Sequence, residues 1–106
     1  MRESLAFLLE DVGYSVATAA DGRQALAWLD ASEPPCLILL DLMMPVMDGW
    51  QLRAELLKAP RLARIPVVLL SGIADLEAQA RSLDAVGYLT KPVDLARVCD
   101  LIDAHC

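Results

Sequence analysis

Residues 37–49 read Leu-Ile-Leu-Leu-Asp-Leu-Met-Met-Pro-Val-Met-Asp-Gly, and the rest of the chain is organised around them. The four aliphatic residues at the start predict a strand buried on both faces, as found inside a parallel sheet. Asp41 follows directly, and Pro45 keeps the next segment from starting as regular helix. In open α/β sheets, sites form outside the carboxyl ends of the strands. The stretch therefore predicts one carboxylate at the mouth of a sheet; the alternative is an aspartate that only caps a turn.

The composition indicates a single domain with an aliphatic core. The chain has 106 residues, of which 57% are hydrophobic but only 5% aromatic. The net charge is −6 and the nine Lys and Arg residues are scattered, which argues against binding nucleic acid or an anionic membrane. No apolar run approaches the roughly eighteen residues that span a bilayer, and the first residues do not resemble a signal peptide. We expect a soluble, cytoplasmic protein.

The cysteines and the histidine exclude several chemistries. Cys36, Cys99 and Cys106 are far apart and form no CxxC pair, so zinc or dithiol redox chemistry has no support. An odd number of cysteines without a secretion signal predicts reduced thiols. His105 is the only histidine, which argues against a Ser-His-Asp or Cys-His catalytic set.

Hydrophobic periodicity predicts alternating helices and strands in one domain, residues 1–106. In the first helix, the apolar residues Leu5, Leu8, Leu9 and Val12 recur at helical spacing. Helices are predicted over Arg2–Val12, Gly22–Ala31, Trp50–Lys58, Asp75–Leu83 and Leu95–Ala104, and a loop over Pro60–Pro66. Strands are predicted over Ser15–Ala19, Cys36–Leu40, Pro66–Leu70 and Val86–Leu89. This order predicts an α/β fold with a parallel sheet, right-handed crossovers and helices on both faces.

Three polar residues follow predicted strands, and parallel strands end at one edge of a sheet. Asp41, Ser71 and Lys91 should therefore share one rim. A carboxylate there can attack phosphorus and form an acyl phosphate, while an ammonium and a hydroxyl neutralise and hydrogen-bond the phosphoryl oxygens. Such transfer usually needs magnesium. Each residue alone also fits a plain structural role, so the functional interpretation depends on the spacing of all three residues.

These motifs resemble the receiver domain of bacterial two-component response regulators, in particular the chemotaxis regulators. The resemblance rests on Asp41–Gly49, on Ser71 thirty residues after Asp41, and on Tyr88-Leu89-Thr90-Lys91-Pro92. It implies a flavodoxin-like three-layer sandwich. It also implies that Asp41 is the phosphoacceptor, Ser71 the switch hydroxyl and Lys91 the phosphate-binding residue.

The resemblance implies further roles. Tyr88 would be the aromatic residue that rotates inward on activation, Pro92 would follow a cis peptide bond, and the Met43 backbone carbonyl would join Asp41 in binding magnesium. The function implied is a module of a phosphorelay, not an enzyme. It would take a phosphoryl group from a histidine kinase or a phosphotransfer protein and switch a protein-interaction surface.

The sequence departs from the family pattern at its beginning. The family's first strand and the acidic pair after it have no counterpart, so we expect four strands, five helices and a weakened magnesium site with one carboxylate where the family offers three. Three arrangements could account for the missing strand: the flanking strands close up into one sheet, two chains pair as a homodimer, or the true start of the protein lies upstream.

Two other functions are compatible with parts of the pattern. A phosphorylation-independent interaction module would explain the lost acidic pair, although the retained Asp41, Ser71 and Lys91 argue against it. A hydrolase of the haloacid dehalogenase type needs a second acid two residues after its nucleophilic aspartate. Met43 occupies that position, which argues against this chemistry.

Overall fold

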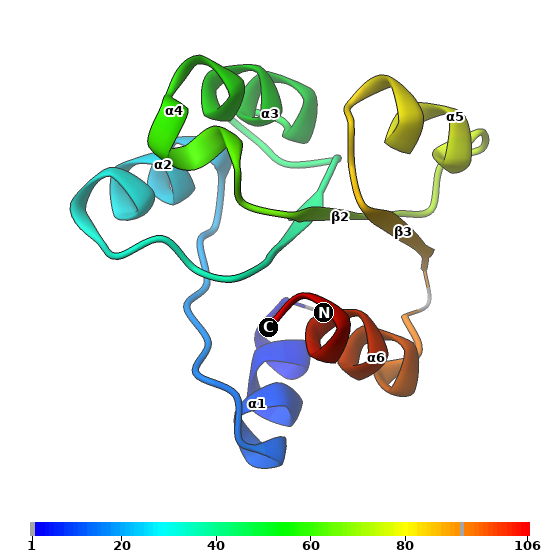
Figure 1. The fold of residues 1–106 in the computed structure, drawn as a ribbon. Helices are drawn as coiled ribbons and strands as arrows, with labels where there is room; N and C mark the ends of the chain where they lie inside the picture. The colour runs from blue at the N-terminus through cyan, green and yellow to red at the C-terminus, as the bar shows by residue number, and fades with distance from the viewer. Residues whose placement is uncertain (1, 92) are drawn as a thin grey trace.

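In the computed structural model of the chain, a parallel sheet lies between two layers of helices (Figure 1). The structure describes the backbone of residues 2–91 and 93–106, and side chains from residue 7 onward within those ranges. The sheet has the order β1-β2-β3, with β1 (Ile38–Asp41), β2 (Val67–Ser71) and β3 (Gly87–Thr90). The helices are α1 (Arg2–Val12), α2 (Gly22–Ala31), α3 (Gly49–Lys58), α4 (Pro60–Ala63), α5 (Leu76–Ser82) and α6 (Leu95–His105).

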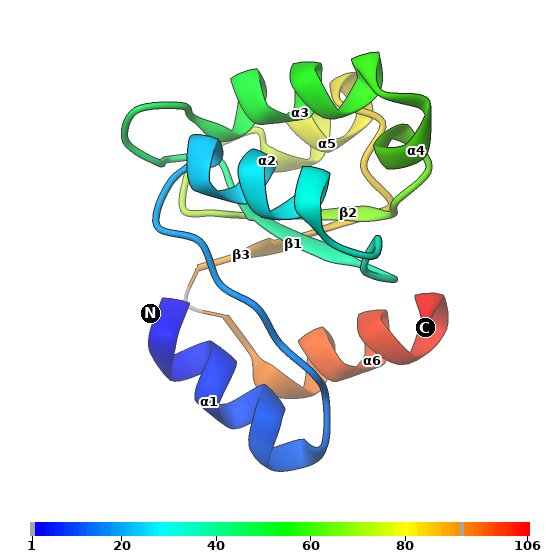
Figure 2. The same cartoon turned by 90° about the vertical axis from the view of Figure 1, so that its left-hand side faces the viewer.

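The central strand β2 divides the core in two. All five of its residues are buried. Helices α2 to α5 cover one face of the sheet, and α1 and α6 cover the other (Figures 1 and 2). Val67 and Leu69 pack into the larger cluster on the first face, and Val68 and Leu70 pack into the smaller cluster on the second. This alternation is what a strand covered on both faces requires. The predicted α/β fold with helices on both sides of a parallel sheet is confirmed.

The predicted strand over Ser15–Ala19 is wrong, so the described residues contain three strands instead of four. Residues 13–21 form an extended connection between α1 and α2, as Figure 2 shows. The β-branched Val16 and Thr18 favour extended backbone, but a strand also needs a neighbour with which to pair. The flanking strands also do not close up, because β1 has β2 on one side and no strand on the other within the described residues.

The number of helices also differs from the expectation of five, because α4 occupies part of the predicted loop over Pro60–Pro66. Pro60 is the first residue of this short helix, a position where its fixed φ fits and its missing N–H costs nothing. None of the helices in the described part of the chain is long and apolar enough to cross a membrane.

Two of the three cysteines are joined in a disulfide, which corrects the expectation of reduced thiols. Cys36 lies just before β1 and Cys106 follows α6, 70 residues later. Their Cα atoms are 5.5 Å apart, within the usual range for a disulfide. Cys99 on α6 is free. The sequence separation hides this pair, because only the packing of α6 along the sheet brings the two residues together.

The first helix buries less of its apolar face than its periodicity predicts. Leu9 is 3% exposed, whereas Leu8 is 44% and Val12 57% exposed; Leu5 lies outside the described side chains. Phe7, on the same helix, is 71% exposed. An apolar surface of α1, formed by Phe7, Leu8 and Val12, thus faces away from the core.

A hydrogen bond between Tyr14 and Asp103 links the end of α1 to α6, and it makes a pH-dependent prediction. The Tyr14 hydroxyl donates to Asp103 Oδ1 over 2.6 Å, and this bond raises the pKa of Tyr14 from 10.0 to about 12. Because the folded-state pKa is raised, the contribution to stability is complete below pH 10 and is lost as the pH rises towards 12. Tyrosinate absorbance should show one component near pH 12 that Tyr14→Phe removes. In Asp103→Asn that component should move down towards pH 10; an unchanged titration there would refute the role of Asp103.

Candidate functional site

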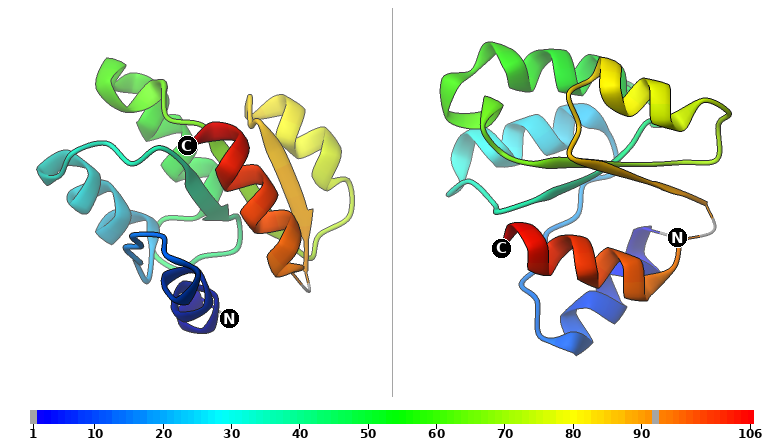
Figure 3. Two further views of the ribbon diagram at one scale, coloured as in Figure 1. Left: turned by 60° about the horizontal axis from the view of Figure 1, so that its bottom comes forward. Right: turned by 45° about the vertical axis from the view of Figure 1, so that its right-hand side comes forward.

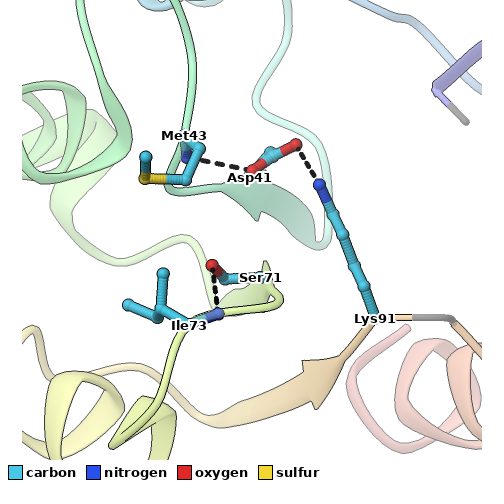
Figure 4. Close-up of polar contacts among 5 residues, drawn as sticks. All are labelled: Asp41, Met43, Ser71, Ile73 and Lys91. Carbon is cyan, nitrogen blue, oxygen red and sulfur yellow. Dashed lines mark hydrogen bonds and ion pairs between the residues drawn. The ribbon is translucent and has the colours of Figure 1, made fainter.

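Asp41 and Lys91 meet at the carboxyl edge of the sheet. Asp41 is the last residue of β1, and Lys91 follows β3 directly. The Lys91 Nζ lies 2.7 Å from Asp41 Oδ2 (Figure 4), with the side chains 33% and 30% exposed. The backbone N–H of Lys91 donates to the Ser71 carbonyl over 3.0 Å, which fixes the start of the lysine beside the end of β2. The structure therefore brings together an accessible carboxylate and an ammonium from strands that are not neighbours.

The second carboxylate oxygen of Asp41 binds the loop that follows it. The backbone N–H of Met43 donates to Asp41 Oδ1 over 3.0 Å. Asp41 thus also caps the turn that follows β1. This hydrogen bond orients the carboxylate so that Oδ2 faces Lys91. Met43 itself is 64% exposed.

Ser71 lies at the same edge, but its hydroxyl is engaged locally. The residue is fully buried at the end of β2, and its Oγ accepts a hydrogen bond from the Ile73 N–H over 3.2 Å (Figure 4). Among the described residues, no hydrogen bond joins this hydroxyl to Asp41 or Lys91. Because Oγ accepts from Ile73, its own proton is left for an oxygen that approaches the edge.

Tyr88 lies on β3 at the border between core and surface. Its half-buried side chain packs against the larger cluster. It also lines a groove of about 360 Å³ between β3 and α6, together with Gly87, Arg97, Asp100 and Leu101. Pro92, for which a cis peptide bond is expected, lies outside the described residues.

The donors at this edge limit how magnesium can bind. Within the described part of the chain, no three Asp, Glu, His or Cys side chains are grouped to hold a metal. Asp41 ends β1 at this edge, and both of its carboxylate oxygens already accept hydrogen bonds. Magnesium usually binds one or two carboxylates together with phosphate and water oxygens. The described residues therefore do not fit an ion held by protein ligands alone, whereas they do fit one whose coordination is completed by phosphate and water.

Gly49 lets the loop after Asp41 fold back on itself. Its N–H donates to the Leu42 carbonyl over 3.0 Å, while Asp48 and Gln51 form a capping box at the start of α3. A Cβ at Gly49 would lie 2.7 Å from Leu42 Cα and 2.9 Å from the Asp41 carbonyl oxygen. The helix start and the strand end can approach this closely because residue 49 has no side chain.

We expect Gly49→Ala to destabilise the fold by about 1–3 kcal/mol, because the clash is with backbone that cannot simply rotate away. Urea unfolding measures this. Gly72→Ala is the matched control, since a Cβ there meets nothing within 4 Å, and it should change stability by less than about 1 kcal/mol. Equal effects of the two substitutions would show that the close approach at Gly49 is not the cause.

Arg53 is a buried charged residue that the sequence analysis did not single out. It is 3% exposed, and its Nε and Nη2 donate to the carbonyls of Leu83 and Asp84 over 2.8 and 3.2 Å. Burial lowers the pKa of its guanidinium. The bonds fix the turn before β3, the strand that carries Lys91. The sequence feature that could have indicated its burial is its position next to Leu52, on the buried side of α3.

Comparison with known proteins identifies this arrangement. The response regulator receiver domain family matches residues 1–103. Protein PilG of Pseudomonas aeruginosa is 37% identical over 108 residues, which cover 99% of this chain and 78% of PilG. The transcriptional regulator RpaA of Synechocystis is 40% identical over 100 residues, which cover 89% of this chain and 41% of RpaA, so the chain spans less than half of that relative.

The fold agrees with the sequence comparison. The crystal structure of the chemotaxis protein CheY4 of Vibrio cholerae matches with a TM-score of 0.86 and 27% identity, over 99% of this chain and 88% of that chain. The chain therefore belongs to the response regulator receiver domain family, and its fold is the flavodoxin-like receiver fold. The resemblance inferred from Asp41, Ser71 and Lys91 is thereby confirmed at the level of the family.

Proposed function

We propose that this chain is a phosphoacceptor module that receives a phosphoryl group on Asp41 from a histidine kinase or a phosphotransfer protein. The observation that carries the proposal is the 2.7 Å pair of Asp41 Oδ2 and Lys91 Nζ at the carboxyl edge of the sheet. An accessible carboxylate beside an ammonium is suited to nucleophilic attack on phosphorus, because the cation neutralises charge that the transfer brings in.

In the proposed reaction, an Asp41 oxygen attacks phosphorus and forms the new P–O bond of an acyl phosphate. The bond from phosphorus to the donor nitrogen breaks, and the donor keeps its electron pair. Lys91 moves its contact from the carboxylate to the phosphoryl oxygens, and the Ser71 hydroxyl donates its free proton to one of them. Magnesium, when bound through Asp41 and the Met43 carbonyl, supplies further charge neutralisation; with so few protein ligands we propose that this binding is weak.

The proposed output is a change in the surface formed by β3 and α6. The phosphoryl group adds about −1.5 to −2 charges beside Lys91, the residue that connects β3 to the segment before α6. The pull of the phosphoryl oxygens on Lys91 and Ser71 favours one of two arrangements of this surface, and in the favoured one Tyr88 rotates further inward. In this proposal, each chain accepts one phosphoryl group in a cytoplasmic relay and does not turn over a substrate as an enzyme does.

The test is the intact mass after incubation with a small phosphodonor, such as phosphoramidate, over a range of magnesium concentrations. The proposal expects one phosphoryl group per chain, labile to hydroxylamine as acyl phosphates are, with half-saturation only at high magnesium. No gain in mass at any magnesium concentration would overturn it.

A second proposal is that two copies associate independently of phosphorylation. The N–H groups of Ile38 and Leu42 donate to the carbonyls of Pro66 and Leu70, so those of the alternate residues Leu39 and Asp41 point away from β2. Among the described residues, this open edge and the exposed apolar surface of α1 both favour a homodimer.

Sedimentation velocity over a range of concentrations tests the dimer. Phe7→Glu should shift the chain towards monomer, whereas the control Leu57→Glu, at an exposed position on α3, should not. If Asp41→Asn associates as the wild type does, the association is independent of phosphorylation. A monomeric mass at every concentration would refute this second proposal.

A further inference from the structure

The disulfide between Cys36 and Cys106 fastens one end of the helix that follows the candidate site. Helix α6 begins four residues after Lys91 and runs antiparallel to the strands, as Figure 3 shows. Its last turn therefore lies at the amino edge of the parallel sheet (Figure 3). There Cys106 is joined to Cys36, which lies just before β1. The closed loop contains all three strands, Asp41 and Lys91.

The layer that this bond fastens has the smaller share of the core. Val98 and Ile102 of α6 pack with Leu9, Val68, Leu70 and Leu89, whereas the opposite layer is held by the larger cluster. A covalent link at the end of α6 therefore contributes a substantial part of what holds the helix to the sheet. Its removal should loosen the last turns of α6 before it affects β2, which is buried at every position.

Both cysteines of the pair are exposed, in contrast to a disulfide sealed in a core. Exposed disulfides are open to attack by small thiols and are the ones that exchange readily. The third cysteine, Cys99, lies partly buried on α6 and is not joined to either of them. The reactivity of the exposed pair can therefore be compared with that of the partly buried Cys99 in the same chain.

We propose that Cys36 and Cys106 form a site of reversible oxidation, at which a low-molecular-weight disulfide such as glutathione disulfide is the oxidant. The thiolate of one cysteine attacks the glutathione disulfide, forms a mixed disulfide and displaces one glutathione thiolate. The thiolate of the second cysteine then attacks the protein sulfur of the mixed disulfide, closes the Cys36–Cys106 bond and displaces the second glutathione. Two protein thiols are oxidised, one glutathione disulfide is reduced, and the two protons pass to the glutathione thiolates.

The proposed consequence is that the disulfide controls how freely the last turn of α6 moves. In the oxidised chain the helix is held at both ends, by the short connection from Lys91 and by the disulfide. In the reduced chain its last turn is held by the smaller cluster and by the Tyr14–Asp103 hydrogen bond. This inference does not depend on phosphorylation of Asp41, so it can fail or succeed independently of the proposed function.

The experiment equilibrates the full chain in glutathione buffers that range from oxidising to reducing, and then alkylates the free thiols with iodoacetamide. Intact mass should show one alkylated cysteine in oxidising buffers and three in reducing buffers, with a midpoint within the range that glutathione buffers. Peptide mapping should identify a link between Cys36 and Cys106. Because the bond closes a loop of 70 residues, the oxidised chain should melt about 10 °C or more above the reduced chain.

The three cysteines provide matched variants. Cys99→Ser should keep the melting shift and change from no alkylated cysteine to two on reduction. Cys36→Ser and Cys106→Ser should each abolish the shift and melt near the reduced wild type. Three alkylated cysteines at every buffer composition would overturn the proposal. So would a pair that stays closed in the most reducing glutathione buffer, since the bond would then be a permanent link, and so would a link that includes Cys99.

Discussion

Replacing Asp41 by asparagine is expected to abolish phosphoryl incorporation while the chain stays folded. The substitution keeps the size of the side chain and the oxygen that accepts from the Met43 N–H, but it removes the nucleophilic carboxylate beside Lys91. Incubation with phosphoramidate and magnesium should leave the mass of Asp41→Asn unchanged under conditions that phosphorylate the wild type. Circular dichroism and urea unfolding show whether the variant is folded.

Asp48→Asn is the matched control for this prediction. Asp48 belongs to the same loop, but its carboxylate caps α3 by accepting from the Gln51 N–H, a role that asparagine can also fill. We expect this variant to be phosphorylated as the wild type is. Phosphorylation of Asp41→Asn at the wild-type level would remove Asp41 from the reaction.

The second large effect is expected for Lys91→Ala, which should slow phosphoryl incorporation by about 10²-fold, the usual cost of losing one donor that stabilises developing charge. The same change should alter the free energy of unfolding by no more than about 1 kcal/mol, because the Asp41–Lys91 pair is partly exposed and such pairs contribute little to folding. The rate of mass gain and urea unfolding measure the two quantities on one preparation.

Lys58→Ala is the control for Lys91. Lys58 also pairs with a carboxylate, that of Glu55 at 3.0 Å, but this exposed pair lies on the surface of α3. It should leave the rate of phosphorylation unchanged. A Lys91→Ala rate within twofold of the wild type would contradict the role assigned to the lysine, whatever its effect on stability.

The sequence predicts well those parts of the fold in which local pattern and burial agree. The run Val67–Leu70 is apolar because both faces of β2 are covered, so its identity as a strand can be read directly from the residues. The pairing of Asp41 with Lys91 is predictable for a related reason. Asp41 ends β1 and Lys91 follows β3, and a parallel sheet brings the carboxyl ends of its strands to one edge.

The errors arise where the outcome depends on a neighbour that local sequence does not specify. Val16 and Thr18 favour extended backbone, yet the segment pairs with no strand of the described sheet. The Cys36–Cys106 disulfide and the burial of Arg53 both depend on how helices pack over residues distant in sequence. The engagement of the Ser71 hydroxyl by Ile73 depends on the geometry of one turn, which residue type alone does not fix.

The most direct test of the account is to locate the phosphoryl group on the chain. The phosphorylated wild type would be treated with borohydride, which reduces an acyl phosphate of aspartate to homoserine, and the peptides would be sequenced by mass spectrometry. The account predicts homoserine at position 41 and at no other aspartate of the loop, Asp48 included. Homoserine at another position, or none in a chain that has gained a phosphoryl group, would contradict the claim that Asp41 is the phosphoacceptor.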